Sequence, residues 1–432
     1  MKNQKKTPRK KKFQLKTWHW AAIITASVLA VLVGGISIWW SCMDVESFSE
    51  GWSLICNLVN PPKNNVRYKD SYSVSDKKAQ KWADKVVATV GGKQLTNGQL
   101  QVYYWMEVYT YLNLSSQAGN DGGLDHAIPL DQQTCPETGD SWQQYFLDRA
   151  LNSWHREQAL ALMAETNGLT LSVDNQVELK NLRQELTKSM VDGGFTSVDA
   201  MLQHDMGAGC DFDDYYSYRN IYFLANTWFA QRYEDHLKGI TQKDLESYYD
   251  AHQDALAEDG ISKDSGYVYA VRHILFAPEG GTTDAEGNVS YTDAAWAQCK
   301  KDAQQILDKW LETDKTETMF AAFADDYSMD TGSNTSGGLY ENLKKDTKIV
   351  KEFVDWYCED GRKVGDYGLI KTELGYHIMY LSAMEPQWQA EARDGLMSDA
   401  SDRIVAEATE KYPMEATYRD MVLSVVDLEK VV

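Results

Sequence analysis

Residues 18–40 contain no Asp, Glu, Lys or Arg, and this run limits what the N-terminal part of the chain can form. A helix over the run would be about 34 Å long, enough to cross a hydrocarbon core of about 30 Å. Tryptophans stand at both of its ends, as in the aromatic belts of membrane interfaces. We therefore expect a single transmembrane anchor at residues 17–40.

Charges around this run predict its orientation. Residues 1–40 hold eight Lys and Arg residues and no acid, whereas acids follow soon after. By the positive-inside rule, the basic head (1–16) lies in the cytoplasm and the remainder lies outside the cell membrane. A cleaved signal peptide, leaving a secreted or lipid-anchored protein, is the alternative. The long apolar run, with Trp39 and Trp40 where a lipobox before Cys42 needs Leu and a small residue, favours the anchor.

The part of the chain after residue 40 is strongly acidic. The whole chain has a net charge of −21, and after residue 40 there are 35 bases against 64 acids, a net charge of −29. Such a charge argues against nucleic acid or an anionic membrane surface as a ligand. None of the six cysteines stands in a CxxC or other metal-ligand spacing, which argues against a zinc site.

Apolar spacing divides this acidic part into four segments. Residues 41–83 are polar and are predicted to be a linker. Residues 84–263 are mainly helical and rich in Tyr, Trp and Met, which indicates a core or, alternatively, a client-binding surface. Residues 264–386 have a mixed α/β pattern that ends in two strands joined by a tight turn. Residues 387–432 read as a helix followed by a strand.

A strand predicted over residues 267–276 carries an unexpected pair of residues. Its apolar positions alternate as in a half-buried strand, yet Arg272 and His273 stand in its middle. A histidine in a strand is more often structural than catalytic. The motifs that follow this strand change that expectation.

Six motifs occur in a fixed order along the mixed segment. They are RHILF (272–276), FAAFADDYSMD (320–330), SGGLYENL (336–343), IVKEF (349–353), VGDYGLIKT (364–372) and GYHIMYL (375–381). In this order they resemble the parvulin (PpiC) family of peptidyl-prolyl cis-trans isomerases. The resemblance implies a small mixed sheet flanked by helices.

The resemblance also implies a set of site residues. His273 and His377 match two histidines that face each other across the sheet, Thr372 a threonine bonded to them, and Asp330 a position that is Cys or Asp in the family. Ile349 and Phe353 match an apolar pocket for the proline ring. The catalytic candidates are His273, Asp330, Thr372 and His377. The substrate-binding candidates are Leu339, Tyr340, Ile349 and Phe353.

Such residue types suit the reaction. Rotation about an X–Pro bond needs no nucleophile, because its barrier of about 18–20 kcal/mol arises from lost amide resonance. A catalyst need only bind the twisted form better than either planar form. An apolar slot can desolvate the imide, and polar groups that hold each other in place can orient it. A purely structural role for the histidine pair stays open as an equal alternative.

Two departures from the family concern the substrate. The chain has GGLYEN at residues 337–342 where the family commonly has GGDLG, so Tyr340 is expected to alter one face of the pocket. Ile349 replaces the usual Met. The loop at residues 277–293 has no Lys or Arg but several acids, which would repel a phosphate before proline. Clients without phosphate are therefore expected.

Residues 86–100, VVATVGGKQLTNGQL, resemble the opening of the chaperone domain of SurA-type and PrsA-type foldases. The resemblance implies an α+β protein: a helical SurA-like domain (84–263), completed by residues 387–432, with an inserted parvulin domain (264–386). The function it implies is a membrane-anchored extracytoplasmic foldase that isomerises X–Pro bonds in newly exported, unfolded polypeptides and chaperones them. The alternative is a holdase with little isomerase activity. No metal, nucleotide or redox cofactor is implied, and a homodimer is left open.

Overall fold

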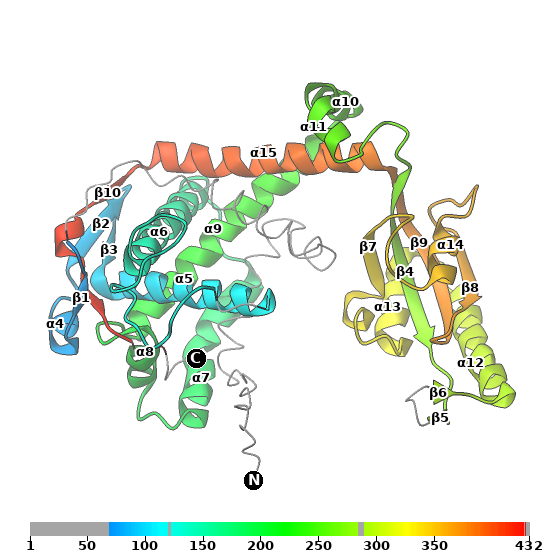
Figure 1. The fold of residues 1–432 in the computed structure, drawn as a ribbon, viewed down its shortest axis with the longest axis horizontal. Coiled ribbons are helices and arrows are strands. Elements are labelled where there is room, and N and C mark those ends of the chain that lie inside the picture. Colours follow the sequence, from blue (N-terminus) through cyan, green and yellow to red (C-terminus); the bar gives the residue numbers. More distant parts are fainter. Residues whose placement is uncertain (1–68, 120–121, 284–288, 427, 429–432) are drawn as a thin grey trace, which may run out of the picture. The chain divides into compact units, whose positions relative to one another are not determined.

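The computed structural model describes residues 69–119, 122–283, 289–426 and 428, which divide into two compact units (Figure 1). One unit comprises Met1–Gly239 and Ser398–Val432, and the other comprises Ile240–Met397. The predicted head, anchor and most of the linker lie outside the described residues. Within the described ranges, no helix is long and apolar enough to cross a membrane.

The first unit is mainly helical. Thr96 begins its helix α5 with a capping box, in which Thr96 and Gln99 exchange side-chain-to-backbone hydrogen bonds. The elements of the unit's first segment are β1 (Ser73–Val74), α4 (Asp76–Lys81), β2 (Val86–Val90), β3 (Lys93–Thr96), α5 (Asn97–Gln117), α6 (Trp142–Thr166), α7 (Val173–Asp192), α8 (Val198–Met206) and α9 (Phe212–Gly239).

Both ends of the described chain build this unit. Its second segment holds the latter part of α15 (Gln387–Lys411), β10 (Met414–Ala416), η2 (Tyr418–Asp420) and β11 (Leu423–Ser424). Strand β10 pairs antiparallel with β2, and β11 pairs parallel with β1. Most aromatic side chains of α5, α6 and α9 belong to one apolar core, with Trp142, Phe146 and Trp154 almost fully buried.

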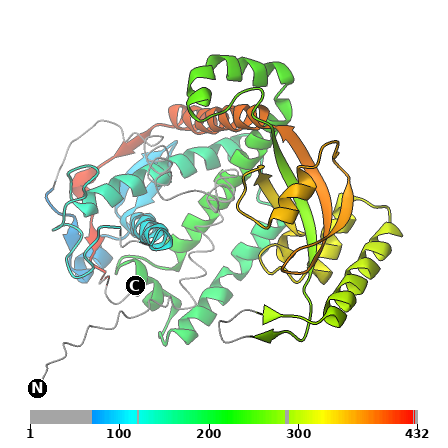
Figure 2. The same cartoon turned by 45° about the vertical axis from the view of Figure 1, so that its right-hand side comes forward.

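The second unit contains one four-stranded sheet with helices on both faces (Figure 2). The sheet order is β7-β4-β9-β8. The unit consists of α10 (Gln242–Ala251), α11 (Gln253–Glu258), β4 (Tyr267–Phe276), β5 (Thr282–Thr283), β6 (Val289–Ser290), α12 (Asp293–Leu311), α13 (Glu317–Tyr327), η1 (Asn334–Ser336), β7 (Leu339–Leu343), α14 (Lys351–Tyr357), β8 (Tyr367–Lys371), β9 (Tyr376–Pro386) and the start of α15.

Alternation along β4 and β9 gives the sheet two apolar faces. Ile274 and Ile378 pack under α12 and α13, whereas Val271 and Met379 pack against Phe353 of α14. The second face therefore carries His273 and His377, which alternate with Ile274 and Ile378 along the two strands.

The predicted mixed sheet is wrong in one respect, because all three strand pairings of this sheet are antiparallel. A tight turn can join β8 to β9 only as an antiparallel hairpin, and β7 and β9 both run against β4. The predicted α+β class, with a helical region and a separate region of strands and helices, is confirmed. The four described cysteines, Cys135, Cys210, Cys299 and Cys358, are free thiols.

Candidate functional site

The two central strands of the sheet bring two histidines into contact. His273 on β4 is 4% exposed and His377 on β9 is 2% exposed. Their rings stack with centroids 5.2 Å apart, and the two Nδ1 atoms are 3.0 Å apart. The strand carries an imidazole because a second imidazole from the neighbouring strand satisfies one of its polar atoms.

A hydrogen-bonded chain continues from both rings. His273 Nε2 lies 2.9 Å from Asp330 Oδ2, just after α13. His377 Nε2 lies 2.8 Å from Thr372 Oγ1, at the end of β8, and Thr372 Oγ1 also accepts from the backbone N–H of Leu374. Four side chains from four segments thus form one line across the sheet.

When both imidazoles are neutral, one arrangement of protons satisfies this line. An ionised Asp330 can only accept, so His273 carries its proton on Nε2 and accepts at Nδ1. His377 then donates from Nδ1 and accepts at Nε2 from the Thr372 hydroxyl. Every polar atom of the two rings has a partner of the right kind, so the line fixes both tautomers.

Charge is distributed unevenly along the line. Burial lowers the pKa of His377 to about 4, and the neighbouring His273 acts in the same direction. The hydrogen bond from His273 lowers the pKa of Asp330 well below its ordinary value, with help from Ser333 and against the effect of burial. At neutral pH the line therefore has a carboxylate at one end and a neutral imidazole in its buried part.

Asp330 is held by a loop that includes a residue the sequence analysis missed. Ser333 is 2% exposed; its hydroxyl donates to Asp330 Oδ2 over 2.6 Å and lies 3.3 Å from His273 Nε2. The backbone N–H of Gly332 donates to the other oxygen of Asp330. A serine three residues after the aspartate in a Gly-containing loop was the available signal.

Arg272 and Gly338 fix the other end of this loop. The Arg272 guanidinium bonds Glu317 and the carbonyls of Ser336 and Gly337. Gly338 has φ +69°, and a Cβ there would lie 2.2 Å from the carbonyl oxygen of His273. A side chain cannot fit at this position, so the glycine lets the loop approach the histidine strand.

An apolar wall lies beside the histidines. The Phe353 ring is 5.2 Å from the His273 ring and 5.8 Å from the His377 ring, edge to face. The Tyr340 ring is 5.2 Å from that of His273 and 6.1 Å from that of Phe353. Ile349 is half-buried against the cluster that contains Phe353. These contacts give the line an aromatic neighbour on which an apolar ring can pack.

Tyr340 also joins the polar line. Its hydroxyl donates to Asp330 Oδ2 over 3.1 Å. Burial raises the pKa of Tyr340 to about 12, and the adjacent Asp330 adds to that rise. The hydroxyl therefore remains a donor at physiological pH.

Leu339 is the one predicted site residue that the structure does not bring to the others. It pairs with Arg272 across β7 and β4. Directly paired residues share a face, so Leu339 lies on the face opposite His273.

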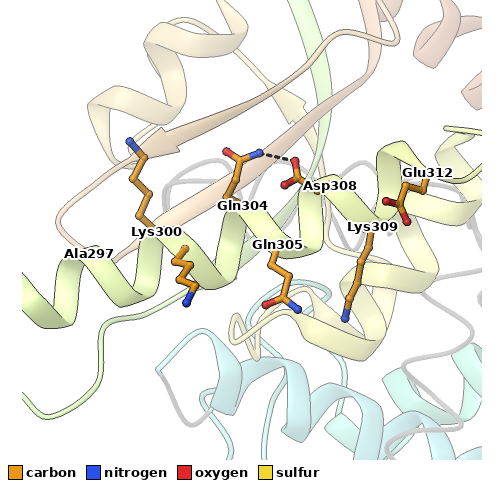
Figure 3. Close-up of a pocket in the computed structure, with 8 residues that line it drawn as sticks. Ala297, Lys300, Gln304, Gln305, Asp308, Lys309 and Glu312 are labelled. Carbon is orange, nitrogen blue, oxygen red and sulfur yellow. Dashed lines mark hydrogen bonds between the residues drawn. The ribbon is translucent and has the colours of Figure 1, made fainter.

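Neither of two surface hollows in the described residues includes this site. The one in Figure 3 is lined only by α12, where Gln304 donates to Asp308, so it is one open helix face. The other, of about 50 Å³, lies in the helical unit among α5, α6 and α9, where it is lined by Tyr103, Met106, Glu107, Thr110, Ser153, Arg156, Glu157 and Tyr218. Within the described ranges, no group of His, Cys, Asp and Glu side chains is suited to hold a metal ion.

The arrangement at His273 can orient a polar, uncharged group without reacting with it. The Thr372 hydroxyl donates to His377, but it is buried, and the lowered pKa of His377 makes that imidazole a weak base, so the hydroxyl is not activated as a nucleophile. The arrangement offers fixed dipoles beside an aromatic wall. Such a site suits a reaction that changes conformation and breaks no bond.

Comparison with known proteins gives matches over this unit and over most of the chain. A family model for the PPIC-type PPIase domain matches residues 261–384. A "Foldase protein PrsA" of Caldanaerobacter subterraneus subsp. tengcongensis is 24% identical over 311 residues, covering 71% of this chain and 76% of that protein.

Two solved structures align with lower similarity. PrsA of Bacillus subtilis has a TM-score of 0.31 at 17% identity, covering 66% of this chain and 93% of that chain. A structure described with PEB4 and Cj1289 of Campylobacter jejuni, two SurA-like chaperones, has a TM-score of 0.21 at 15% identity, covering 76% of this chain and 96% of that chain.

Proposed function

We propose, from the premise that residues 261–384 are a PPIC-type peptidyl-prolyl isomerase domain, that the chain is a membrane-anchored extracytoplasmic foldase. In this proposal the domain isomerises X–Pro bonds of newly exported polypeptides, and the helical unit chaperones the same clients. The foldase relative over 71% of the chain supports the combination. The apolar run at residues 18–40 supports the anchor.

One observation carries the catalytic part: the histidines of the line Thr372–His377–His273–Asp330 lie beside the wall made by Phe353 and Tyr340. A proline ring packed on Phe353 would place its imide bond beside the histidines, away from bulk water. Dehydration removes the solvent hydrogen bonds that favour the planar, charge-separated amide. The fixed dipoles of the line can then bind the twisted form better than either planar form.

The roles of single residues follow from their positions. His273 and His377 would orient the imide through their locked tautomers, and Thr372 would hold the tautomer of His377. Asp330 would supply the negative end of the line. No atom is transferred in this reaction, so the site needs no cofactor, and each residue acts by orientation alone.

A second function is favoured by Tyr340. Its ring packs on both His273 and Phe353, and its hydroxyl donates a hydrogen bond to Asp330. If a client cannot displace that ring, the domain would bind extended peptides without accelerating rotation. The chain would then be a holdase whose second unit is only a binding surface.

Refolding of a protein limited by X–Pro isomerisation separates the two functions. The full chain should shorten the slow refolding phase, and a chain lacking residues 264–386 should not. Both should suppress aggregation of an unfolded client if the helical unit is the chaperone. A full chain that suppresses aggregation but leaves the slow phase unchanged would establish the holdase.

The membrane topology has its own test. Protease added to intact cells should degrade the part after residue 40 and spare the head. The mature protein should keep its Lys-rich N-terminus. A mature N-terminus at or after Cys42 would replace the anchor by a processed signal peptide. Crosslinking of the membrane-bound protein at low concentration would decide whether it is a homodimer.

A further inference from the structure

The small cavity of the helical unit, about 50 Å³ in volume, has polar walls although it lies between three helices of the apolar core. Tyr103 and Glu107 of α5 stand four residues apart and therefore share one face of that helix. Ser153 and Glu157 of α6 have the same spacing, and Tyr218 of α9 completes the wall. A polar lining inside a core indicates ordered water or a ligand.

Part of this lining is already paired. Both oxygens of Glu107 accept hydrogen bonds, one from Arg149 Nε over 2.9 Å and the other from the Ser153 hydroxyl over 2.5 Å. One oxygen of Glu157 accepts from the Tyr103 hydroxyl over 3.0 Å. Arg149 thus balances the charge of Glu107, which has little capacity left for a ligand.

Three other groups of the lining keep hydrogen-bonding capacity. Tyr218 is 3% exposed, yet no described residue lies within hydrogen-bonding distance of its hydroxyl. The second oxygen of Glu157, which is 5% exposed, likewise lacks a partner among the described contacts. The guanidinium of the half-buried Arg156 makes no ion pair or hydrogen bond within the described part of the chain. Buried polar groups ordinarily have partners, so these three point to a ligand.

The charges of the cavity favour an anion. Burial raises the pKa of Glu157 to about 7 and that of Tyr218 well above its ordinary value, so below pH 7 both have a proton to donate. The other titratable or charged groups that face Glu157 from the three helices are Tyr103, Glu107, Arg156, Tyr218 and Arg219. Arg149 pairs with Glu107, and Glu178 pairs with Arg219. The charge left uncompensated among these groups is the positive charge of Arg156.

The size of the cavity restricts the anion. Pockets that enclose drug-sized ligands measure roughly 300–1,000 Å³, so this cavity admits one small group and not a sugar or a nucleotide. A carboxylate is planar and accepts at two oxygens, which suits a guanidinium beside hydroxyl donors. A phosphate dianion would bring more negative charge next to Glu107.

We propose that the cavity between α5, α6 and α9 binds one carboxylate group, with Arg156, Tyr218 and Glu157 as its donors. One oxygen of the ligand accepts from Arg156 and the other from the two buried groups. The half-buried Arg156 and Ser153 mark the mouth of the cavity, and the buried Glu157 and Tyr218 mark its base. A small free acid and the C-terminus of a polypeptide share this chemistry. The site lies in the helical unit and does not depend on the isomerase function.

The methyl group of Met106, which also lines the cavity, can report binding. The full chain in detergent, with isotope-labelled methionine methyl groups, is titrated with sodium acetate at constant ionic strength, and Met106→Leu assigns the signal. Acetate should shift the Met106 signal to saturation, and sodium chloride should not. The signal of Met379, which is 0% exposed in the second unit, should stay in place.

Two further probes distinguish the sources of the carboxylate. They are the N-acetylated tripeptide Ala-Ala-Ala with a free C-terminus and the same peptide as its C-terminal amide. A free-acid peptide that binds about tenfold more tightly than acetate, with an amide that does not bind, identifies a polypeptide C-terminus. A peptide that binds no better than acetate identifies a small free acid.

Binding of acetate should be about tenfold tighter at pH 6 than at pH 8. The ligand requires the form of the protein in which Glu157 holds its proton, and with a pKa of about 7 that form falls about tenfold over this range. Glu157→Gln can donate from its amide at any pH, so its affinity should be equal at both pH values.

Arg156→Gln should weaken binding of acetate by about tenfold or more, because it removes a charged donor. The control Arg232→Gln changes an arginine of α9 that is 43% exposed and paired with Asp235, and it should keep the parent affinity. Circular dichroism checks the folding of each variant. If Arg156→Gln does not fold, the comparison of Glu157→Gln with the parent at the two pH values decides.

Three results would overturn the proposal. The first is a Met106 signal that neither acetate nor the free-acid peptide shifts to saturation. The second is a parent affinity that is equal at pH 6 and pH 8. The third is a folded Arg156→Gln variant that binds acetate as tightly as the parent, or an equal loss of affinity in the Arg232→Gln control.

Discussion

Two buried imidazoles are costly unless every ring nitrogen has a partner. Here Asp330 satisfies one end, Thr372 the other, and the two Nδ1 atoms satisfy each other. The stability of this arrangement should depend on pH, because protonation of His377 would turn an accepting ring nitrogen into a donor. That dependence can be measured.

Stability of the second unit should fall when the pH drops below 6.5. The pKa of His377 is 6.5 in the unfolded chain and about 4 in the folded protein, so only the unfolded state binds this proton between those values. The loss should approach about 3 kcal/mol near pH 4. Hydrogen exchange of β9 amides, corrected for intrinsic rates, would measure it. The variant His377→Asn should lose most of this slope, and an unchanged slope would contradict the assignment.

Ser333 should act as a positioning residue for Asp330. Ser333→Ala removes one donor from a carboxylate that also serves His273 and Tyr340. We expect a tenfold lower kcat with KM changed less than twofold, together with a stability loss of about 1–2 kcal/mol. Ser290→Ala, in the exposed β5–β6 hairpin of the same unit, is the control and should change neither value. A rise in KM as large as the expected fall in kcat would indicate that Ser333 acts in substrate binding instead.

The sequence could predict part of this site. His273, His377, Thr372 and Asp330 stand in motifs whose order indicates their convergence, and the structure brings all four together. Their catalytic roles stay a prediction. Ser333 was missed because its position depends on how the loop after Asp330 folds back. Leu339 was predicted to bind substrate together with Tyr340, but adjacent residues in a strand point to opposite faces.

At the scale of elements, helix α6 carries a buried acid, Glu157. The described contacts include no basic group within bonding distance of it. Glu157 is 5% exposed, and its carboxylate accepts from the Tyr103 hydroxyl beside the small cavity of the helical unit. Burial raises the pKa of Glu157 from 4.5 to about 7. The helices α5 and α6 are therefore packed around a group that resists ionisation.

Glu157→Gln should stabilise the helical unit at high pH only. The folded protein holds this proton up to about pH 7 and the unfolded chain only up to 4.5, so the wild-type unit loses stability as the pH rises between these values. At pH 8 the variant should be more stable by about 2–3 kcal/mol, and at pH 4.5 nearly equal to the parent. Urea unfolding followed by circular dichroism would measure both. A gain of equal size at both pH values would contradict this cause.

Two buried amides of α5 bond the C-terminal segment: Gln101 accepts from Ser424 N–H, and Asn97 makes three further hydrogen bonds. Asn97 accepts from Val422 N–H and donates to the carbonyls of Asp420 and Trp82. Asn97→Ala should cost about 2–4 kcal/mol, since it leaves buried backbone groups unpaired. Asn181→Ala, on the exposed side of α7, should change stability by less than about 0.5 kcal/mol. Limited proteolysis should release the C-terminal segment first in the Asn97 variant only.

Elements were predictable where local pattern decides them. The capped start of α5 at Thr96 and the β8–β9 hairpin follow from capping chemistry and a tight turn, and both are present. The strand directions of the sheet were not predictable in the same way. They depend on how β7 returns to β4 after α12 and α13, and on how the β8–β9 hairpin returns after α14, which no short motif encodes.

At the scale of the whole molecule, one unit is built from two distant parts of the chain. Strands β10 and β11 pair with β2 and β1, so residues before 240 and after 397 share one core. The family prediction is confirmed for the second unit, whose residues 261–384 match the PPIC-type domain. The predicted domain boundaries and the chaperone role of the helical unit stay predictions. The predicted anchor, at residues 17–40, lies outside the described residues.

Deleting residues 264–386 and joining the ends should leave a folded helical unit. The expectation rests on the core of that unit, which includes no residue of the deleted range. Circular dichroism should show a cooperative, mainly helical protein that still suppresses aggregation of an unfolded client. A deletion product that fails to fold would contradict the division of labour between the two units.

The central claim is that the polar line and the Phe353 wall catalyse X–Pro rotation. Its most direct test is the NMR exchange rate of a Leu-Pro peptide with the full chain and with the double variant Asp330→Ala and His377→Ala, each checked for folding by circular dichroism. The parent should accelerate exchange, and the folded variant should be slower by about a hundredfold, the loss expected when fixed dipoles are removed from a site. A folded double variant as fast as the parent would rule out this pocket as the catalytic centre.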